Sequence, residues 1–130
     1  MHELERDVER RLVRGVKALG GTAYKWVCPG TVGVPDRIVV WPGGRVDFIE
    51  LKTETGVLSP RQKIVLDHLR SLGCNVRVLR GSDAVAAYLL DTHYQTRVLR
   101  DPGDEEGVKW GLSRILTRSF AFRLSWTRLR

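Results

Sequence analysis

Apolar residues recur along the first twenty positions at the interval of a helix. They are separated by four, four, four and three residues: Leu4, Val8, Leu12, Val16 and Leu19. Residues at these spacings lie on one stripe of an α-helix, and mostly charged residues fill the positions between them. The pattern predicts an amphipathic helix over residues 3–19, which Gly20 and Gly21 end.

Three segments that follow this helix are typical of β-strands. They are rich in β-branched and aromatic residues: TAYKWV at 22–27, DRIVVW at 36–41 and RVDFIEL at 45–51. The segment CPGTVGVP at 28–35 is typical of a loop, because Pro and Gly interrupt it. Pro42, Gly43 and Gly44 separate the second strand from the third. A three-residue connection with Gly where a positive φ is needed predicts a β-hairpin.

The pattern then changes to helix, strand and helix. Ser59 can cap a helix that begins at Pro60. Its apolar side is formed by four residues: Ile64, Leu66, Leu69 and Leu72. CNVRVLR at 74–80 is the fourth predicted strand, and Ser82 opens a short helix that extends to about Leu90. The order α-β-β-β-α-β-α predicts an α/β fold with a mixed central sheet flanked by helices.

Beyond Leu90 the periodic pattern weakens. The segment DPGDEEG at 101–107 is acidic and rich in helix breakers, which is typical of a linker. We therefore predict a domain over residues 1–90 and a basic C-terminal extension over 91–130. Three structures stay open for residues 107–130: a strand, a second helix–strand unit, or a tail that becomes ordered only on a partner.

Composition narrows the choice of partner and compartment. The formal charge of +7 favours a polyanion, and nucleic acid is the commonest one. No apolar run is long enough to span a membrane, and the N-terminus lacks the features of a signal peptide. We expect a cytoplasmic protein with no membrane partner and no small-molecule cofactor. Cys28 and Cys74 are isolated in the sequence and are expected to be reduced thiols.

Two carboxylates and an amine converge if the predicted hairpin adopts one register. If Trp41 pairs with Arg45 across the turn, Asp36 lies directly opposite Glu50. Opposed residues share a face of the sheet, with Cβ atoms about 4.5–5.5 Å apart. Lys52 projects from the same face because strand side chains alternate with a period of two.

A two-residue Gly43-Gly44 turn is the alternative. It would place Asp36 opposite Leu51 and separate the cluster, since a slip of one residue moves a side chain to the other face. We favour the first register. Any one of the three charges could be a solvated strand residue, but together, in a strand that also contains Phe48 and Ile49, they are costly without a function.

The chemistry that this cluster supports is phosphodiester hydrolysis. Opposed carboxylates repel each other unless a cation neutralises them, and Mg²⁺ needs only one or two carboxylates with waters and a substrate phosphate. Asp36 and Glu50 would hold the metal, with the backbone carbonyl of Leu51 as a further ligand. Lys52 would hydrogen-bond the attacking water or stabilise charge on the phosphate oxygens.

Several segments resemble the VRR-NUC family of the PD-(D/E)XK nuclease superfamily: GVPDR at 33–37, FIELK at 48–52, TETGVLSPRQ at 53–62 and LGCNVRVLR at 72–80. The resemblance covers about residues 3–90. It implies a restriction-endonuclease-like core and the catalytic residues Asp36, Glu50 and Lys52. Gln62 matches the family's glutamine on the following helix and joins the catalytic set, with its amide positioning Glu50, Lys52 or a water. A solvated helix residue is the alternative for Gln62.

The resemblance also implies a glutamate on the first helix that binds a metal directly or through water. Glu5 is preferred, because it stands at the family's usual distance before the glycine that ends the helix. Glu9 is the alternative and Glu3 a poor third, and an exposed surface role is equally open for each. Lys25 resembles a basic residue of the family, and Lys25 and Arg37 are the candidate DNA contacts.

Together these features predict a DNA endonuclease that uses Mg²⁺ or Mn²⁺. The resemblance implies a stand-alone, phage-type enzyme that cuts branched DNA such as Holliday junctions. A homodimer is expected, because symmetric cutting of two strands requires two active sites. Two alternatives stay open: a catalytically silent nucleic-acid-binding module that recruits a partner, and a sequence-specific restriction enzyme, for which no recognition domain is evident.

Overall fold

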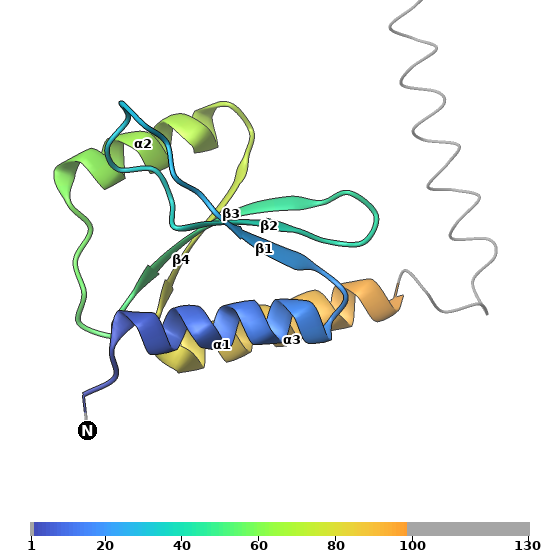
Figure 1. Ribbon diagram of the computed structural model, residues 1–130. Helices are drawn as coiled ribbons and strands as arrows, with labels where there is room; N and C mark the ends of the chain where they lie inside the picture. Colours follow the sequence, from blue (N-terminus) through green and yellow to red (C-terminus); the bar gives the residue numbers. More distant parts are fainter. Residues whose placement is uncertain (1, 99–130) are drawn as a thin grey trace, which may run out of the picture. The chain divides into compact units, whose positions relative to one another are not determined.

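The computed structural model describes residues 2–98, in which helices pack on both faces of a four-stranded sheet (Figure 1). The helices are α1 (Glu5–Ala18), α2 (Pro60–Ser71) and α3 (Gly81–Val98). The strands are β1 (Thr22–Lys25), β2 (Arg37–Val40), β3 (Val46–Lys52) and β4 (Asn75–Arg80). The element order confirms the α/β fold that the sequence predicts.

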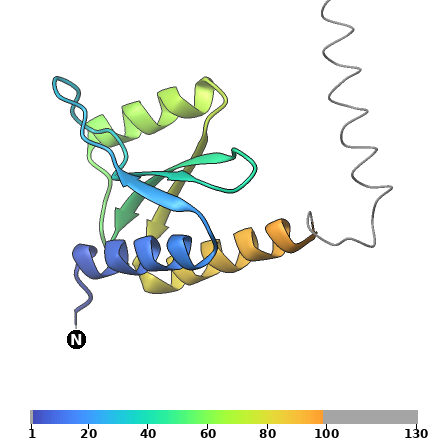
Figure 2. The ribbon, with the colours of Figure 1, turned by 45° about the vertical axis from the view of Figure 1, so that its right-hand side comes forward.

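The sheet is mixed, as expected. Its strand order is β1-β2-β3-β4. β2 pairs antiparallel with both β1 and β3, and β4 pairs parallel with β3. A parallel pair needs a crossover connection, and α2 supplies it. In Figures 1 and 2, α1 and α3 lie side by side on one face of the sheet, and α2 covers the other face. The centre of β3 is therefore covered on both sides.

The β2–β3 hairpin has the register that the three-residue turn predicts. Arg37 pairs with Ile49 and Val40 with Val46, while Trp41 N donates to the carbonyl of Arg45 at 2.9 Å. Gly43 and Gly44 have φ angles of 91° and 89°, in the left-handed region that side chains other than glycine rarely adopt. The turn residues thus fix which side of β3 each side chain faces.

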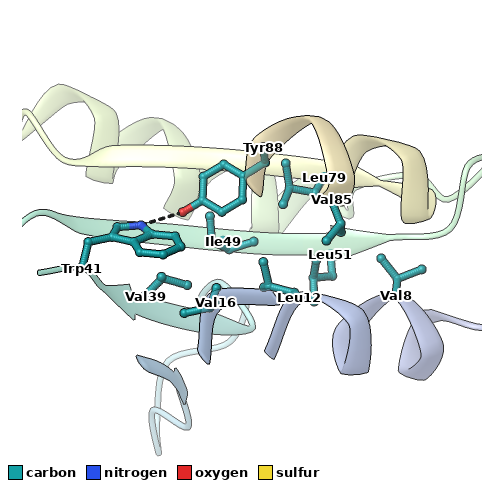
Figure 3. Packing of buried hydrophobic residues seen from close by; sticks show 10 residues of the cluster. All are labelled: Val8, Leu12, Val16, Val39, Trp41, Ile49, Leu51, Leu79, Val85 and Tyr88. Atoms are coloured by element: carbon teal, nitrogen blue, oxygen red, sulfur yellow. Dashed lines mark hydrogen bonds between the residues drawn. The ribbon is translucent and has the colours of Figure 1, made fainter. Parts of the chain in front are cut away.

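The core lies between the sheet and the α1–α3 layer. Figure 3 shows its buried residues meeting from five elements: Val8, Leu12, Val16, Val39, Trp41, Ile49, Leu51, Leu79, Val85 and Tyr88. Along β3, Asp47, Ile49 and Leu51 face this layer. The alternate residues, among them Glu50, face α2, because successive strand side chains point to opposite sides.

The last described helix is longer than predicted. It was expected to end near Leu90, but α3 continues to Val98. Part of the reason is a contact beyond Leu90: the Arg45 side chain donates to Thr92 Oγ1 at 3.0 Å, and Thr92 is only 1% exposed. Most of the predicted extension over 91–130 lies outside the described residues, so the division of the chain near residue 90 stays a prediction.

Cys28 and Cys74 are both free thiols of intermediate exposure, as the sequence predicts. Cys28 lies in the loop between β1 and β2, and Cys74 directly precedes β4. Within residues 2–98, no helix combines the length and the apolar character that crossing a bilayer requires.

A buried carboxylate connects the β2–β3 hairpin to α3 near the hairpin turn. Asp47 is 3% exposed, and its Oδ2 accepts hydrogen bonds from Trp41 Nε1 at 3.0 Å, Arg45 at 3.0 Å and the Tyr88 hydroxyl at 2.6 Å. Burial, followed by the hydrogen bond to Asp47, raises the pKa of Tyr88, so the phenol stays a donor. No local sequence pattern around Asp47 predicts these contacts.

Replacing Asp47 by Ala is expected to lower the free energy of unfolding by about 1–3 kcal/mol, because it leaves two buried donors, on Trp41 and Tyr88, and the partly exposed guanidinium of Arg45 without their shared acceptor. Urea denaturation measures the change. The control is Asp67→Ala on α2, whose side chain is 74% exposed and pairs with Arg70. That exposed pair contributes less than about 1 kcal/mol, and equal losses in both variants would contradict the role of Asp47.

Candidate active site

Glu50 is a fully buried carboxylate on the side of β3 that faces α2. It is 0% exposed, and its Oε1 accepts a hydrogen bond from Gln62 Nε2 at 2.5 Å. The ammonium of Lys52 lies 2.7 Å from the same oxygen. The other oxygen, Oε2, is buried and has no hydrogen-bond partner among residues 2–98. Such an atom is uncommon, because a polar group that leaves water without a new partner costs free energy.

Lys52 joins Glu50 to the first helix. Its Nζ also donates to Glu5 Oε1 at 3.0 Å, and its side chain is only 14% exposed. Burial alone would lower the pKa of Lys52, but the hydrogen bonds to Glu50 and Glu5 outweigh it and raise the pKa. The amine is therefore a cation at neutral pH, bound between two carboxylates.

The pKa of Glu50 is shifted in the direction expected for a crowded, buried carboxyl. Burial raises it most, the hydrogen bond from Lys52 lowers it, and the nearby charges of Asp36 and Glu5 raise it further. The net shift is upward. The negative charges of Asp36 and Glu50 are thus close enough to repel each other.

Asp36 is placed by the hairpin register and by a side-chain bond that ends the strand pairing. Because Arg37 pairs with Ile49, the same register continued by one residue brings Asp36 opposite Glu50. The Asp36 carboxylate accepts a hydrogen bond from the backbone N–H of Leu51 at 2.8 Å. A side chain thereby takes the place of the next ladder bond, and β2 begins one residue later than predicted.

The two candidate helix glutamates have different partners. Glu5 contacts Lys52 and so joins the cluster. Glu9 instead accepts hydrogen bonds from Lys25 at 3.0 Å and from Arg37 Nε at 2.9 Å. Burial would raise the pKa of Glu9, but the bonds from Lys25 and Arg37 outweigh it and lower the pKa. The geometry groups Glu5, rather than Glu9, with Lys52.

The two candidate DNA contacts differ in accessibility. The side chain of Lys25 is 57% exposed, although it pairs with Glu9. Arg37 is 17% exposed, and its guanidinium donates to Glu9 and to the carbonyl of Ala23. Lys25 is therefore open to a phosphate, whereas Arg37 chiefly connects β2, β1 and α1.

Gln62 is held in place by the start of α2. Its amide oxygen accepts from the backbone N–H of Ser59 at 2.8 Å, and the Ser59 hydroxyl accepts from the N–H of Gln62 at 3.2 Å. This reciprocal pair is a capping box. The Ser-x-x-Gln spacing is visible in the sequence, but only the capping role of Ser59 was drawn from it. The box leaves the Gln62 amide nitrogen directed at Glu50.

Gly33 positions the loop before β2 against this helix. Its φ is +95°, and a Cβ atom there would lie 2.9 Å from the backbone carbonyl of Arg61 and 3.0 Å from Gln62 N. No side chain fits in that space without moving the first turn of α2. A glycine at this position therefore allows the loop that carries Asp36 and the helix that carries Gln62 to approach closely.

The described residues fit a metal site built from two carboxylates. Among residues 2–98, no group of three or more His, Cys, Asp and Glu side chains is placed to hold a metal ion. Glu5 contacts Lys52. Mg²⁺ and similar ions need only one or two carboxylates when waters and a substrate phosphate complete the coordination. Asp36 and the unpartnered Oε2 of Glu50 meet that need.

Comparison with known proteins identifies the family of the chain. The family model described as "VRR-NUC domain" matches residues 22–83. A protein named "Putative nuclease p44", from Acyrthosiphon pisum secondary endosymbiont phage 1, is 42% identical over 79 residues, which cover 61% of this chain and 85% of that protein. The chain belongs to the VRR-NUC family.

Solved structures of this family share the fold. A structure titled "VRR_NUC domain" superposes with a TM-score of 0.62 at 31% identity, covering 64% of this chain and 90% of the other. A second, "VRR_NUC domain protein", has a TM-score of 0.56 at 17% identity and covers 69% and 88% of the two chains. These likenesses confirm the restriction-endonuclease-like fold.

VRR-NUC proteins are nucleases, and the family generally uses divalent metals. The matched range contains Asp36, Glu50, Lys52 and Gln62 but begins after α1. The helix glutamate therefore lies outside the part of the chain that the family model covers. Its assignment depends on the contacts of Glu5 and Glu9 alone.

Glu9→Gln is expected to lower the free energy of unfolding at pH 7 by about 1–2 kcal/mol, because charged hydrogen bonds to Lys25 and Arg37 are lost. The pKa of Glu9 is lower in the folded protein than its ordinary 4.5. The stabilisation is therefore complete above that value and disappears as the pH falls through the folded-state pKa. Urea denaturation at pH 7 and at acidic pH tests this, and a difference between wild type and variant that persists or grows in acid would contradict it.

Proposed function

We propose that this VRR-NUC nuclease is a divalent-metal-dependent DNA endonuclease in which Asp36, Glu50 and Lys52 are the catalytic residues. The observation that supports this most is the asymmetry of Glu50. Gln62 and Lys52 hold one of its oxygens, while the other is buried and unpartnered within residues 2–98. A buried carboxylate held in this way is suited to act as a metal ligand, because the protein fixes its orientation before the ion binds.

Asp36 and Glu50 would hold Mg²⁺ or Mn²⁺, with the backbone carbonyl of Leu51 as a further ligand. A bound ion of this kind lowers the pKa of a coordinated water and polarises the scissile phosphate. The bond from Leu51 N to Asp36 fixes one carboxylate, as Gln62 fixes the other. Both ligands are therefore oriented by the protein itself.

Lys52 would act as a cation rather than as a base. Its raised pKa keeps it protonated at neutral pH, so it can donate a hydrogen bond to the attacking water or to a phosphate oxygen on which charge grows. Glu5 would position this ammonium from α1. In this assignment Glu5 acts through Lys52, and Glu9 serves the packing of α1 against β1 and β2.

The substrate and assembly follow from the resemblance and from charge. The net charge of +7 suits a nucleic acid, and exposed Lys25 is open to its phosphates. We further propose that the substrate is branched DNA and that the active assembly is a homodimer. The proposed location is the cytoplasm. A dimer would bring together two clusters, as symmetric cleavage of two strands requires.

Cleavage assays test the catalytic assignment directly. Labelled four-way junction, nicked duplex, linear duplex and single strand are incubated with Mg²⁺ or Mn²⁺. Glu50→Gln and Lys52→Ala are each expected to lower the cleavage rate at least about 100-fold, the effect of removing one group that stabilises the transition state. The exposed residues Glu54 and Lys63 provide matched controls, as Glu54→Gln and Lys63→Ala.

The nuclease proposal is supported if the wild type and both controls cut DNA in a metal-dependent way and both site variants do not. The substrate that the wild type cuts fastest tests the branched-DNA proposal. Tight binding of DNA by the wild type with no cutting in either metal would overturn the enzyme and favour a binding module.

Glu5→Gln tests the helix glutamate. The substitution removes the carboxylate charge that binds the Lys52 ammonium. It is expected to lower kcat about 10-fold, which is typical for a residue that orients a catalytic group. Glu9→Gln is the matched control, one turn along the same helix, and should leave kcat nearly unchanged. An unchanged kcat in Glu5→Gln, or a larger loss in Glu9→Gln, would contradict the assignment.

A further inference from the structure

The side of α1 that faces away from the core is basic. Its buried stripe is Val8, Leu12 and Val16. Five exposed cationic residues lie elsewhere on the helix: Arg6, Arg10, Arg11, Arg14 and Lys17. At 3.6 residues per turn, all of these except Arg11 lie opposite the buried stripe, and Arg11 lies beside them. The outer face of α1 therefore presents a column of positive charge, here called the α1 basic face.

Most of this charge is not neutralised within the described part of the chain. Arg10 pairs with Asp7 at 2.9 Å, with both side chains largely exposed. Arg6, Arg11, Arg14 and Lys17 make no ion pair or side-chain hydrogen bond with residues 2–98. An unpaired cluster of like charges on one helix face is unfavourable by itself and favours a polyanionic partner.

The α1 basic face borders a groove between α1 and α3. The groove has a volume of about 680 Å³, and Arg10, Arg11 and Arg14 line it. The two helices approach closely at Gly15, where a Cβ atom would lie 2.1 Å from Leu89 Cδ1. Its two acidic lining residues are already bonded: Asp7 to Arg10, and Glu3 to Ser82 at the start of α3. The net character of the groove is positive.

This surface is separate from the catalytic cluster. Glu50 faces α2, whereas α1 covers the opposite face of the sheet (Figure 2). The buried stripe of α1 packs in the core, so its exposed basic side lies away from the sheet. The N-terminal part of α1 lies next to the cluster, because Glu5 contacts Lys52 and Glu9 contacts Arg37. Duplex DNA is stiff, with a persistence length of about 150 base pairs, so one straight duplex cannot follow both surfaces.

We propose that the α1 basic face, with the groove beside it, binds the phosphate backbone of a second arm of a branched nucleic acid whose first arm lies at the catalytic cluster. The inference rests on the proposed nuclease function and adds a structural reason for a branched substrate. From Arg6 to Lys17 the helix rises about 16 Å, which is the length of about five nucleotides of one duplex strand.

Binding measured without divalent metal tests this, because nothing is then cut. The full chain is compared with Arg11→Gln/Arg14→Gln, since Gln keeps helix propensity and adds no like charge. The control is Lys63→Gln/Arg70→Gln, which removes the same charge from two exposed residues of α2. Far-UV circular dichroism checks that both variants are folded. The probes are a four-way junction and a linear duplex of about 12 base pairs, which is straight on this scale.

The α1 variant is expected to raise the Kd for the junction about 10-fold and to reduce the slope of log K against log salt by about 2, one phosphate contact per arginine. Its Kd for the short duplex should change less than about 2-fold, and the control should bind both probes like the wild type.

An unchanged Kd for the junction, or equal losses in the α1 variant and the control, would overturn the proposal. Equal loss on the junction and the short duplex would also overturn it, because the α1 basic face would then contact the same duplex as the cluster. Binding of phosphatidylserine vesicles that depends on these arginines, with junction binding unaffected, would assign the face to a membrane surface instead. Cleavage by the wild type is measured separately, so failure of the nuclease proposal is distinguishable from failure of this one.

Discussion

The buried carboxylate of Glu50 is the constraint around which the site is built. A charge at 0% exposure must be compensated, and both the same strand and a helix distant in sequence supply the compensation. Lys52 comes from the same strand and Gln62 from α2, while Glu5 on α1 holds Lys52 in turn. One oxygen of Glu50 is thereby satisfied, and the other is buried without a hydrogen-bond partner among residues 2–98. The same contacts that stabilise the charge also connect both helical layers to the sheet.

The hairpin register decides where this charge lies. With Arg37 opposite Ile49, Glu50 faces α2, whereas Asp47, Ile49 and Leu51 face α1 and α3. Two buried carboxylates result, on opposite faces of one strand. Asp47 Oδ2 accepts hydrogen bonds from Trp41, Arg45 and Tyr88 and serves stability, whereas Glu50 Oε2 is buried with no hydrogen-bond partner among residues 2–98. This buried oxygen without a partner, rather than burial of the carboxylate, distinguishes Glu50 from Asp47.

Local patterns predicted the fold and the central cluster because their causes are local. The turn glycines set the register, and period-two alternation then placed Lys52 beside Glu50. Contacts between distant segments were not predictable in this way. Asp47 meets Tyr88 across 41 positions, and Glu5 and Glu9 lie on one column of α1, so that helix geometry alone cannot separate them. Only the packing of α1 shows that Glu5 reaches Lys52 while Glu9 reaches Lys25 and Arg37.

The most direct test of the central claim is anomalous diffraction from crystals soaked in Mn²⁺. If Asp36 and Glu50 hold the metal, a Mn²⁺ peak is expected beside Glu50 Oε2 and the Asp36 carboxylate, and it should be absent from crystals of Glu50→Gln soaked in the same way. A peak bound only to other acidic residues, or no peak at a Mn²⁺ concentration that supports cleavage, would contradict the assignment of Glu50 as a metal ligand.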